Sequence, residues 1–310
     1  EKENIAKIKK IFPNAVIFEE RIHDLGIIEK CADAEIISVF VYSMVTAKIL
    51  SKMPNLKMIA MRGVGYDKIS LDYLKKHNIQ LANVPDYGSH VIAEHVFALL
   101  LSAIRRIREA DKRVKEGIFA YEGLGGMSLK NKTIGIIGVG KIGSIVSKIA
   151  SGFEMNILAN DIYKNKGIIE QYQVQYVNQE TIFRDSDIIT LHVPLLPTTQ
   201  HMINSKTIAL MKDGAILINT ARGPIIKTSD LIEAIKNNKF AYVLLDVLES
   251  EDKMISKNKE IQKLVSFPNV ISTPHIAFYT EHSMKSIYSQ TLSSIKQFLN
   301  QEKIINQVKF

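Results

Sequence analysis

The chain has 310 residues, of which 46% are hydrophobic and 23% are charged, as in an ordinary globular protein. No apolar run reaches the roughly 18 to 20 residues that a membrane-spanning helix needs. The single Cys31 excludes a disulfide framework and a multi-cysteine metal site. The net charge is +8, but lysines alternate with acidic residues along the chain, which argues against nucleic-acid binding. We expect a cytoplasmic protein without a metal.

Short runs with strand composition alternate with amphipathic segments, which predicts an α/β fold with parallel sheets. The first twelve residues carry isoleucines at helical spacing. Strands are then expected at 15–18, 35–41, 57–61 and 80–82. A long helix should follow from 89 to about 115, and a glycine-containing loop should extend from 117 to 128.

The second half of the chain has a clearer pattern. Six strands are expected at 133–137, 156–160, 187–191, 215–219, 242–245 and 270–272. Segments with helical periodicity lie between them, for example 141–152 and 229–237. Six strands joined by such crossovers predict a doubly wound nucleotide-binding fold.

A glycine-rich turn follows the first of these strands and opens a helix. In the run GVGKIG, Gly138 permits a tight turn, Gly140 lets the backbone approach a pyrophosphate, and Gly143 lets helix and strand pack closely. Alone, this pattern is weak evidence. Asp161 strengthens it, because it ends the next strand, where an acidic side chain binds the adenosine ribose hydroxyls. A carboxylate there repels a 2′-phosphate and favours NAD over NADP.

Polar residues follow the other strands at their carboxyl ends, which is where such sheets bind ligands. His192 has two readings of equal weight: it lines the cofactor pocket, or it satisfies a backbone group. Each polar residue taken singly would more often be a surface group than a functional one. The runs at these strand ends are His192-Val193-Pro194, Asn219-Thr220-Ala221-Arg222, Asp246 and Thr273-Pro274-His275.

The runs INTARGP, LLDVLESE, STPHIAFYTEHS, RGVGYDKISLD and VPDYGSHVIAEH resemble the D-2-hydroxyacid dehydrogenase family. The resemblance covers nearly the whole chain. It implies two doubly wound parallel-sheet domains: a Rossmann NAD-binding domain at 97–277, and a flavodoxin-like substrate domain at 1–96 and 278–310. Hinges would lie near Val96 and Phe278, and closure would exclude water before hydride transfer.

By this resemblance, three residues form the catalytic centre. Arg222 binds the substrate, and its planar fork suits a carboxylate or a carbonyl oxygen. His275 is the acid/base, because a histidine exchanges protons near neutral pH. Glu251 is its partner, and a carboxylate beside the imidazole stabilises the imidazolium that reduction of a keto acid requires.

The resemblance also implies the remaining cofactor contacts. Lys141 and Ile142 would lie along the pyrophosphate, and Thr220, Ala221 and Asp246 near the nicotinamide. The full expected NAD set adds Gly138, Gly140, Gly143, Asp161, His192, Val193, Pro194, Arg222 and His275 to these.

The turn that contains Arg62, Val64 and Gly65 follows a strand of the first domain, and its glycines suggest a nest of amides for the substrate carboxylate. Tyr87 lies where D-lactate dehydrogenases tend to carry a tyrosine. Tyr279, with Phe278, resembles the lactate and 2-hydroxyisocaproate branch. Pyruvate and D-lactate are therefore the expected pair, with branched 2-keto acids next.

Relatives in this family typically begin with a central strand that precedes the first residue here, so we expect that the sequence starts inside the substrate domain. The helix at 89–115 and the loop after it resemble the family's dimer contact, which implies a homodimer. Three alternatives remain open: a glyoxylate or hydroxypyruvate reductase, a phosphoglycerate dehydrogenase, and an NAD-sensing corepressor of the same fold.

Overall fold

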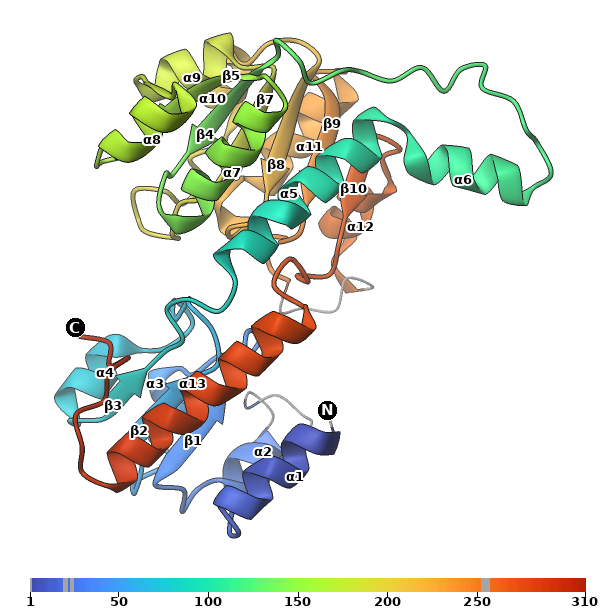
Figure 1. Cartoon of the computed structure of the whole chain (residues 1–310). Helices are drawn as coiled ribbons and strands as arrows, with labels where there is room; N and C mark the ends of the chain where they lie inside the picture. The colour runs from blue at the N-terminus through green and yellow to red at the C-terminus, as the bar shows by residue number, and fades with distance from the viewer. Residues whose placement is uncertain (1, 19–21, 23–24, 252–256) are drawn as a thin grey trace. The chain divides into compact units, whose positions relative to one another are not determined.

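The computed structural model describes residues 2–18, 22, 25–251 and 257–310. They form two compact units, Glu1–Gly88 with Tyr279–Phe310, and Ser89–Phe278 (Figure 1). The first boundary between these units falls at Gly88, and Val96, where the resemblance implied a hinge, lies inside the helix that follows. Helix α5 (Ser89–Ile104) begins at this boundary and packs as a whole on the second unit, against α7 and β9. No helix among the described residues is long and apolar enough to cross a membrane.

The first unit is built on a three-stranded parallel sheet in the order β1-β2-β3. Residues 15–18 were expected to form a strand, but they do not, and Val16 is 73% exposed with no partner strand in the described part of the chain. The elements are α1 (Lys2–Ile11), α2 (Leu25–Lys30), β1 (Ile36–Val39), α3 (Ala47–Leu50), β2 (Met58–Met61), α4 (Leu71–Lys76), β3 (Gln80–Ala82) and α13 (Glu281–Leu299).

Both faces of this small sheet are buried. Ile37 and Ile59 on one face contribute to the larger core of the unit. Met58 and Ala60 on the other face belong to a smaller core, against which α13 packs with Ile295 and Phe298. The end of the chain returns to the sheet as well, since the amide of residue 308 donates to the carbonyl of residue 81 over 2.8 Å. The last 32 residues therefore fold with the first part of the chain.

The second unit contains a seven-stranded parallel sheet in the order β10-β9-β8-β7-β4-β5-β6. The sequence pattern predicted six of these strands and missed β6, a two-residue edge strand without an apolar run. The strands are β4 (Thr133–Ile137), β5 (Asn156–Asn160), β6 (Gln175–Tyr176), β7 (Ile188–Leu191), β8 (Ala215–Asn219), β9 (Phe240–Leu245) and β10 (Val270–Ser272).

Helices cover both faces of this sheet (Figure 1). Successive strand residues alternate between two cores: Ile188 packs with α5, α7 and α8, and Ile189 with α9 to α12. The central strands β7 and β8 are buried along their whole length and mostly apolar, because helices cover both faces of the sheet. The remaining helices of the unit are α6 (Ile107–Lys115), α7 (Lys141–Gly152), α8 (Lys166–Tyr172), α9 (Gln179–Asp185), α10 (Ser205–Leu210), the 3₁₀ turn η1 (Gly223–Ile225), α11 (Thr228–Lys236) and α12 (Lys259–Ser266).

The single helix expected from 89 to 115 is two helices. It breaks at Arg106, which adopts a left-handed backbone with φ of 52°. The carbonyl of Ile104 accepts the amide of Met127 over 3.0 Å, and the Arg106 side chain donates to the carbonyl of Gly123. These contacts with a later loop provide hydrogen-bond partners where α5 ends, so α6 starts in a new direction. Periodicity alone could not show this break.

Gly135 in β4 lets helix α9 approach the sheet. A Cβ at this position would lie 2.3 Å from the Ser186 hydroxyl and 2.7 Å from Ile182. We expect that Gly135→Ala lowers the free energy of unfolding by about 1–3 kcal/mol, the usual cost of overpacking a core. Gly152→Ala is the matched control, because a Cβ there meets nothing within 4 Å. Urea denaturation of both variants checks this, and equal stability would contradict the packing argument.

Candidate functional site

The sequence-predicted residues of the second unit gather at one edge of its sheet. The strand order reverses between β4 and β7, so the loops that leave these two strands diverge to opposite faces, which is the point at which sheets of this kind bind ligands. The loops after β5, β8, β9 and β10 leave from the same edge, because all the strands are parallel. The structure therefore brings together the glycine turn, Asp161, Arg222, Asp246 and His275.

The glycine turn has the geometry that a dinucleotide pyrophosphate requires. Gly138 has a φ of 91°, and a Cβ there would lie 2.7 Å from the backbone of His192. A Cβ on Gly143 would lie 2.1 Å from the carbonyl of Gly138, so helix and strand could not pack as they do. Gly140 caps the start of α7 and has open space on its Cβ side. A phosphate therefore has room beside the helix N-terminus, where Lys141 and Ile142 begin.

Asp161 follows β5 and ties the glycine turn to the next loop. Its carboxylate accepts the amide of Val139 through one oxygen and that of Tyr163, over 3.2 Å, through the other. A carboxylate has about four acceptor positions, so both oxygens can still accept ribose hydroxyls. The residues present thus fit an adenosine with a free 2′-hydroxyl, as in NAD.

His192 lies behind the glycine turn with its imidazole facing Thr190. The Thr190 hydroxyl is 3.0 Å from Nε2, so the partner of the ring is a side chain and not the backbone group that one reading expected. Burial lowers the pKa of His192 to about 3, which keeps the ring neutral. Val193 packs on the core and Pro194 is exposed, its carbonyl accepting the Thr199 hydroxyl over 2.6 Å.

Asn219 shapes the turn that carries Arg222. It is fully buried at the end of β8. Its Oδ1 accepts the amide of Ala221 over 3.0 Å, and its Nδ2 donates to the carbonyl of Arg222 over 2.8 Å. The Thr220 hydroxyl is buried and has no hydrogen-bond partner among the described residues, so it is available to a bound group. The turn is therefore held by one amide side chain and not by regular structure.

Gly223 brings the Arg222 turn against the segment that leads to Glu251. A Cβ at Gly223 would lie 2.1 Å from the backbone of Leu248. Nearby, Glu249 accepts the amide of Thr228 over 3.0 Å and lies 2.7 Å from Nε2 of His201. These contacts connect the Arg222 turn with the segment that precedes Glu251.

His275 and Glu251 form a close pair. Nδ1 of the imidazole lies 3.0 Å from Oε1 of Glu251, and the two side chains are only 13% and 17% exposed. The backbone of His275 is left-handed with φ of 55°, an uncommon conformation for a residue with a side chain. Phe278 sets its ring edge-on to the imidazole at 6.2 Å. The imidazole thus presents Nδ1 to the Glu251 carboxylate.

The buried carboxylate of Asp246 holds the backbone on both sides of His275. It accepts the amides of Ile276 and Ala277, each over 2.9 Å, and the hydroxyl of Thr273. Burial raises the pKa of Asp246, but hydrogen bonds from His95, Thr273 and the two amides outweigh it and lower the pKa overall. Both oxygens thus accept hydrogen bonds within the protein, and the contact with nicotinamide that the resemblance implied stays a prediction.

His95 was missed by sequence reasoning. Its Nε2 lies 3.1 Å from the Thr273 hydroxyl and 3.5 Å from Asp246. The only signal in the sequence was the run VIAEH, which reads as part of an apolar helix face. A contact between residues 178 positions apart has no local pattern that could reveal it.

In the first unit, the expected substrate turn follows β2. Gly63 is not in the left-handed region, so the turn is not the alternating nest that its two glycines suggested. The carbonyls of Gly63 and Val64 accept the amide of Val84 and the side chain of Asn83. The amides of Val64 and Gly65 donate no hydrogen bond within the described residues, so they can still bind a carboxylate.

Arg62 lies at the base of this turn. Its guanidinium sits 5.1 Å from the centre of the Phe40 ring, and Nε is buried without a partner among the described atoms. Burial lowers the pKa of Arg62, and Tyr288 on α13 partly offsets this. Tyr87 is half-buried in the segment just before Gly88, and Tyr279 is 65% exposed.

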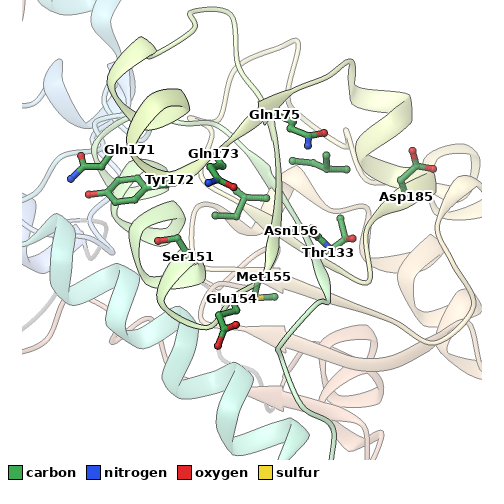
Figure 2. A pocket seen from close by; sticks show the side chains of 12 residues that line it. Thr133, Ser151, Glu154, Met155, Asn156, Gln171, Tyr172, Gln173, Gln175 and Asp185 are labelled. Atoms are coloured by element: carbon green, nitrogen blue, oxygen red, sulfur yellow. The ribbon is translucent and has the colours of Figure 1, made fainter.

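A separate hollow of about 620 Å³ lies at the amino ends of β4 and β5, where Thr133 and Asn156 begin the strands (Figure 2). Polar side chains from α7, α8 and β6 line it. It is at the edge of the sheet opposite the glycine turn and belongs to no part of the site. In the described part of the chain, no cluster of three or more His, Cys, Asp or Glu side chains could hold a metal ion.

Residues 97–277 match the family described as D-isomer specific 2-hydroxyacid dehydrogenase, NAD binding domain. The D-lactate dehydrogenase of Escherichia coli is 33% identical over 94% of this chain and 92% of that protein. An aromatic 2-oxoacid reductase of Clostridium sporogenes is 38% identical over 78% of this chain and 76% of that protein.

The structural similarity extends over the whole chain. The crystal structure of Aquifex aeolicus D-lactate dehydrogenase, complexed with NAD and lactic acid, matches with a TM-score of 0.90 and 37% identity, over 97% of this chain and 94% of that one. The glycine turn, Asp161 and the His275–Glu251 pair lie within the residues that match the family. The chain therefore belongs to the D-2-hydroxyacid dehydrogenases, NAD-dependent oxidoreductases that act on the CH–OH group of their substrates.

Proposed function

We propose that this protein reduces a small 2-keto acid to the D-2-hydroxy acid, with pyruvate as the preferred substrate. The observation that carries the proposal is the His275–Glu251 pair, with 3.0 Å between Nδ1 and Oε1, at the sheet edge that also carries the glycine turn. Similarity to proteins named D-lactate dehydrogenase, one of them bound to lactic acid, supports pyruvate as the substrate.

His275 is the proposed proton donor. Glu251 faces Nδ1 and orients the ring, so that Nε2 gives its proton to the carbonyl oxygen of the keto acid. NADH supplies the hydride that adds to the carbonyl carbon. The product is the D-2-hydroxy acid, and His275 is left neutral until it takes up another proton. The side chains of the pair are mostly shielded from water, which strengthens their attraction.

Arg222 and the turn at 62–65 are the proposed substrate-binding groups. The Arg222 guanidinium has five donors in a planar fork, and its Nη1 donates to the neighbouring carbonyl of Ala221 over 2.8 Å. The amides of Val64 and Gly65, together with the charge of Arg62, suit the carboxylate. Tyr87 and Tyr279 are proposed to set the size of the substrate tail.

Asp161 and the glycine turn are the proposed NAD-binding groups, with the helix N-terminus of α7 opposite the pyrophosphate. His192, Val193 and Pro194 would form one wall of the cofactor site, and Thr220 would offer its hydroxyl. The residues proposed for cofactor binding are Gly138, Gly140, Lys141, Ile142, Gly143, Asp161, His192, Val193, Pro194, Thr220, Ala221, Arg222, Asp246 and His275.

Oxidation of NADH with a panel of keto acids tests the substrate. Pyruvate should react fastest, ahead of 2-ketoisocaproate, phenylpyruvate, hydroxypyruvate and glyoxylate, as the similarity to proteins named D-lactate dehydrogenase supports. We expect His275→Asn to lose about 100- to 10,000-fold in kcat, the usual contribution of a positioned acid. No turnover with any acid, despite NADH binding, would instead favour an NAD-sensing regulator.

The kcat and KM values of variants distinguish the proposed roles of Arg222 and Glu251. Arg222→Gln should raise KM for the keto acid and lower kcat by about 100- to 1,000-fold, because it removes binding and charge stabilisation together. Glu251→Gln should lower kcat with little effect on KM. Glu249→Gln is the matched control, since Glu249 pairs with His201 and not with His275. Equal loss of kcat in both glutamate variants would contradict the assignment.

We also propose that the protein is a homodimer through α6 and the loop after it, which extend from the rest of the second unit (Figure 1). Helix α6 has no buried residue, and Ile107 and Val114 are 55% and 54% exposed. In the loop, Phe119 is 94% and Tyr121 is 83% exposed. A second copy of the chain would remove this apolar surface from water.

Light scattering tests the dimer. The wild-type protein should have twice the 34.9 kDa chain mass, and Phe119→Ser with Tyr121→Ser should shift it toward the monomer. Ile305→Ser, which changes a residue that is 79% exposed in the first unit, should leave the mass unchanged. A monomeric wild-type protein at micromolar concentration would refute the proposal.

A further inference from the structure

His95 begins a chain of hydrogen bonds that ends at the turn that carries His275, called the catalytic turn below. It lies on α5, and its side chain is 19% exposed. Nε2 is 3.1 Å from Oγ1 of Thr273, whose hydroxyl donates to Oδ1 of Asp246 over 2.5 Å. A threonine hydroxyl has only one proton, and it is committed to the carboxylate. Oγ1 can therefore only accept from His95, so Nε2 of His95 carries a hydrogen and donates it.

Asp246 extends this chain of hydrogen bonds to the backbone around His275. Its carboxylate accepts the amides of Ile276 and Ala277, and its backbone carbonyl accepts the amide of His275 over 2.8 Å. His275 itself has a left-handed backbone, which other contacts must hold in place. The imidazole can meet Glu251 only if this turn keeps its conformation.

The same network joins the two places where the chain enters and leaves the second unit. The chain enters at Ser89, the first residue of α5, and leaves at Phe278, directly after Ala277. His95 holds the entering helix to Thr273, and Asp246 holds the leaving segment through its amides. The position of α5 and the conformation of the catalytic turn are thus linked through one buried carboxylate.

We propose that His95 is a positioning residue for the catalytic histidine: by donating to Thr273 it fixes the Thr273–Asp246 hydrogen bond and so holds the turn that presents His275 to Glu251. The proposal rests on the proposed role of His275 as the proton donor. His95 itself needs no contact with the reacting atoms.

The kinetic test compares His95→Leu with His95→Gln. The leucine variant loses the donor, and we expect kcat to fall about ten- to a hundredfold, as misplacement of a reacting group does. When NADH carries deuterium in place of the transferred hydrogen, the isotope effect on kcat should be larger in the leucine variant than in the wild type, because hydride transfer limits the rate more strongly. Glutamine carries an amide donor and should restore part of kcat. His77→Leu, at an exposed histidine stacked on Tyr73 in the first unit, should behave as wild type.

A double-mutant cycle separates positioning from general damage. Thr273→Val keeps the shape of the side chain and removes the hydroxyl, so it should reproduce the loss in His95→Leu. The double variant should then lose less than the product of the two single losses, because His95 and Thr273 act on the same carboxylate, His95 also directly from 3.5 Å. Multiplied losses in the double variant, or a leucine variant with wild-type kcat and isotope effect, would overturn the proposal.

A spectroscopic measurement keeps the proposal testable without turnover. In protein with ¹⁵N-labelled histidine, the ring signals of His275 are identified by their absence in His275→Asn. They should shift in His95→Leu and remain in place in His77→Leu. If the wild-type protein reduces none of the keto acids, the proposed function fails, and these signals alone decide the role of His95. Unshifted signals would refute it.

Discussion

The parallel direction of all seven strands in the second unit is the constraint on which the site depends. Parallel strands end at the same edge, so each crossover carries the chain back to the opposite edge and the next strand delivers its polar residue to the first edge. The strand order reverses between β4 and β7, so the loops after these two strands diverge beside the glycine turn. Apolar strands buried on both faces keep this arrangement rigid, and the loops supply the chemistry.

Glycines allow close backbone contacts between the loops at this edge of the sheet. The turn at Gly138 lies against the backbone of His192, and Gly143 lies against Gly138. Gly223 lies against Leu248 in the same way, which brings the Arg222 turn to the segment that leads to Glu251. At each position a side chain would push apart two segments that have to meet at the site.

Three polar groups at this edge differ in their surroundings. Burial of its ring lowers the pKa of His192 to about 3, so it stays neutral with Nε2 facing the Thr190 hydroxyl. Asp246 is as deeply buried, but hydrogen bonds lower its pKa and keep it ionised. His275 lies with Nδ1 3.0 Å from Oε1 of Glu251. The fold thus places a neutral imidazole, an ionised carboxylate and an imidazole–carboxylate pair on neighbouring loops.

The sequence by itself determined the α/β class, four strands of the second unit to the residue, the dinucleotide turn with Asp161, and the family to which the chain belongs. These features depend on local periodicity and on short motifs, which the order of residues displays directly. Only the tertiary structure decided that the helix at 89–115 breaks at Arg106, that residues 15–18 form no strand, and that the two oxygens of Asp246 are engaged within the protein. It also brought His95 to Thr273. Each of these depends on contacts between residues far apart in the chain, such as Met127 on Ile104 and Asp246 on Ala277, and no local pattern encodes such contacts.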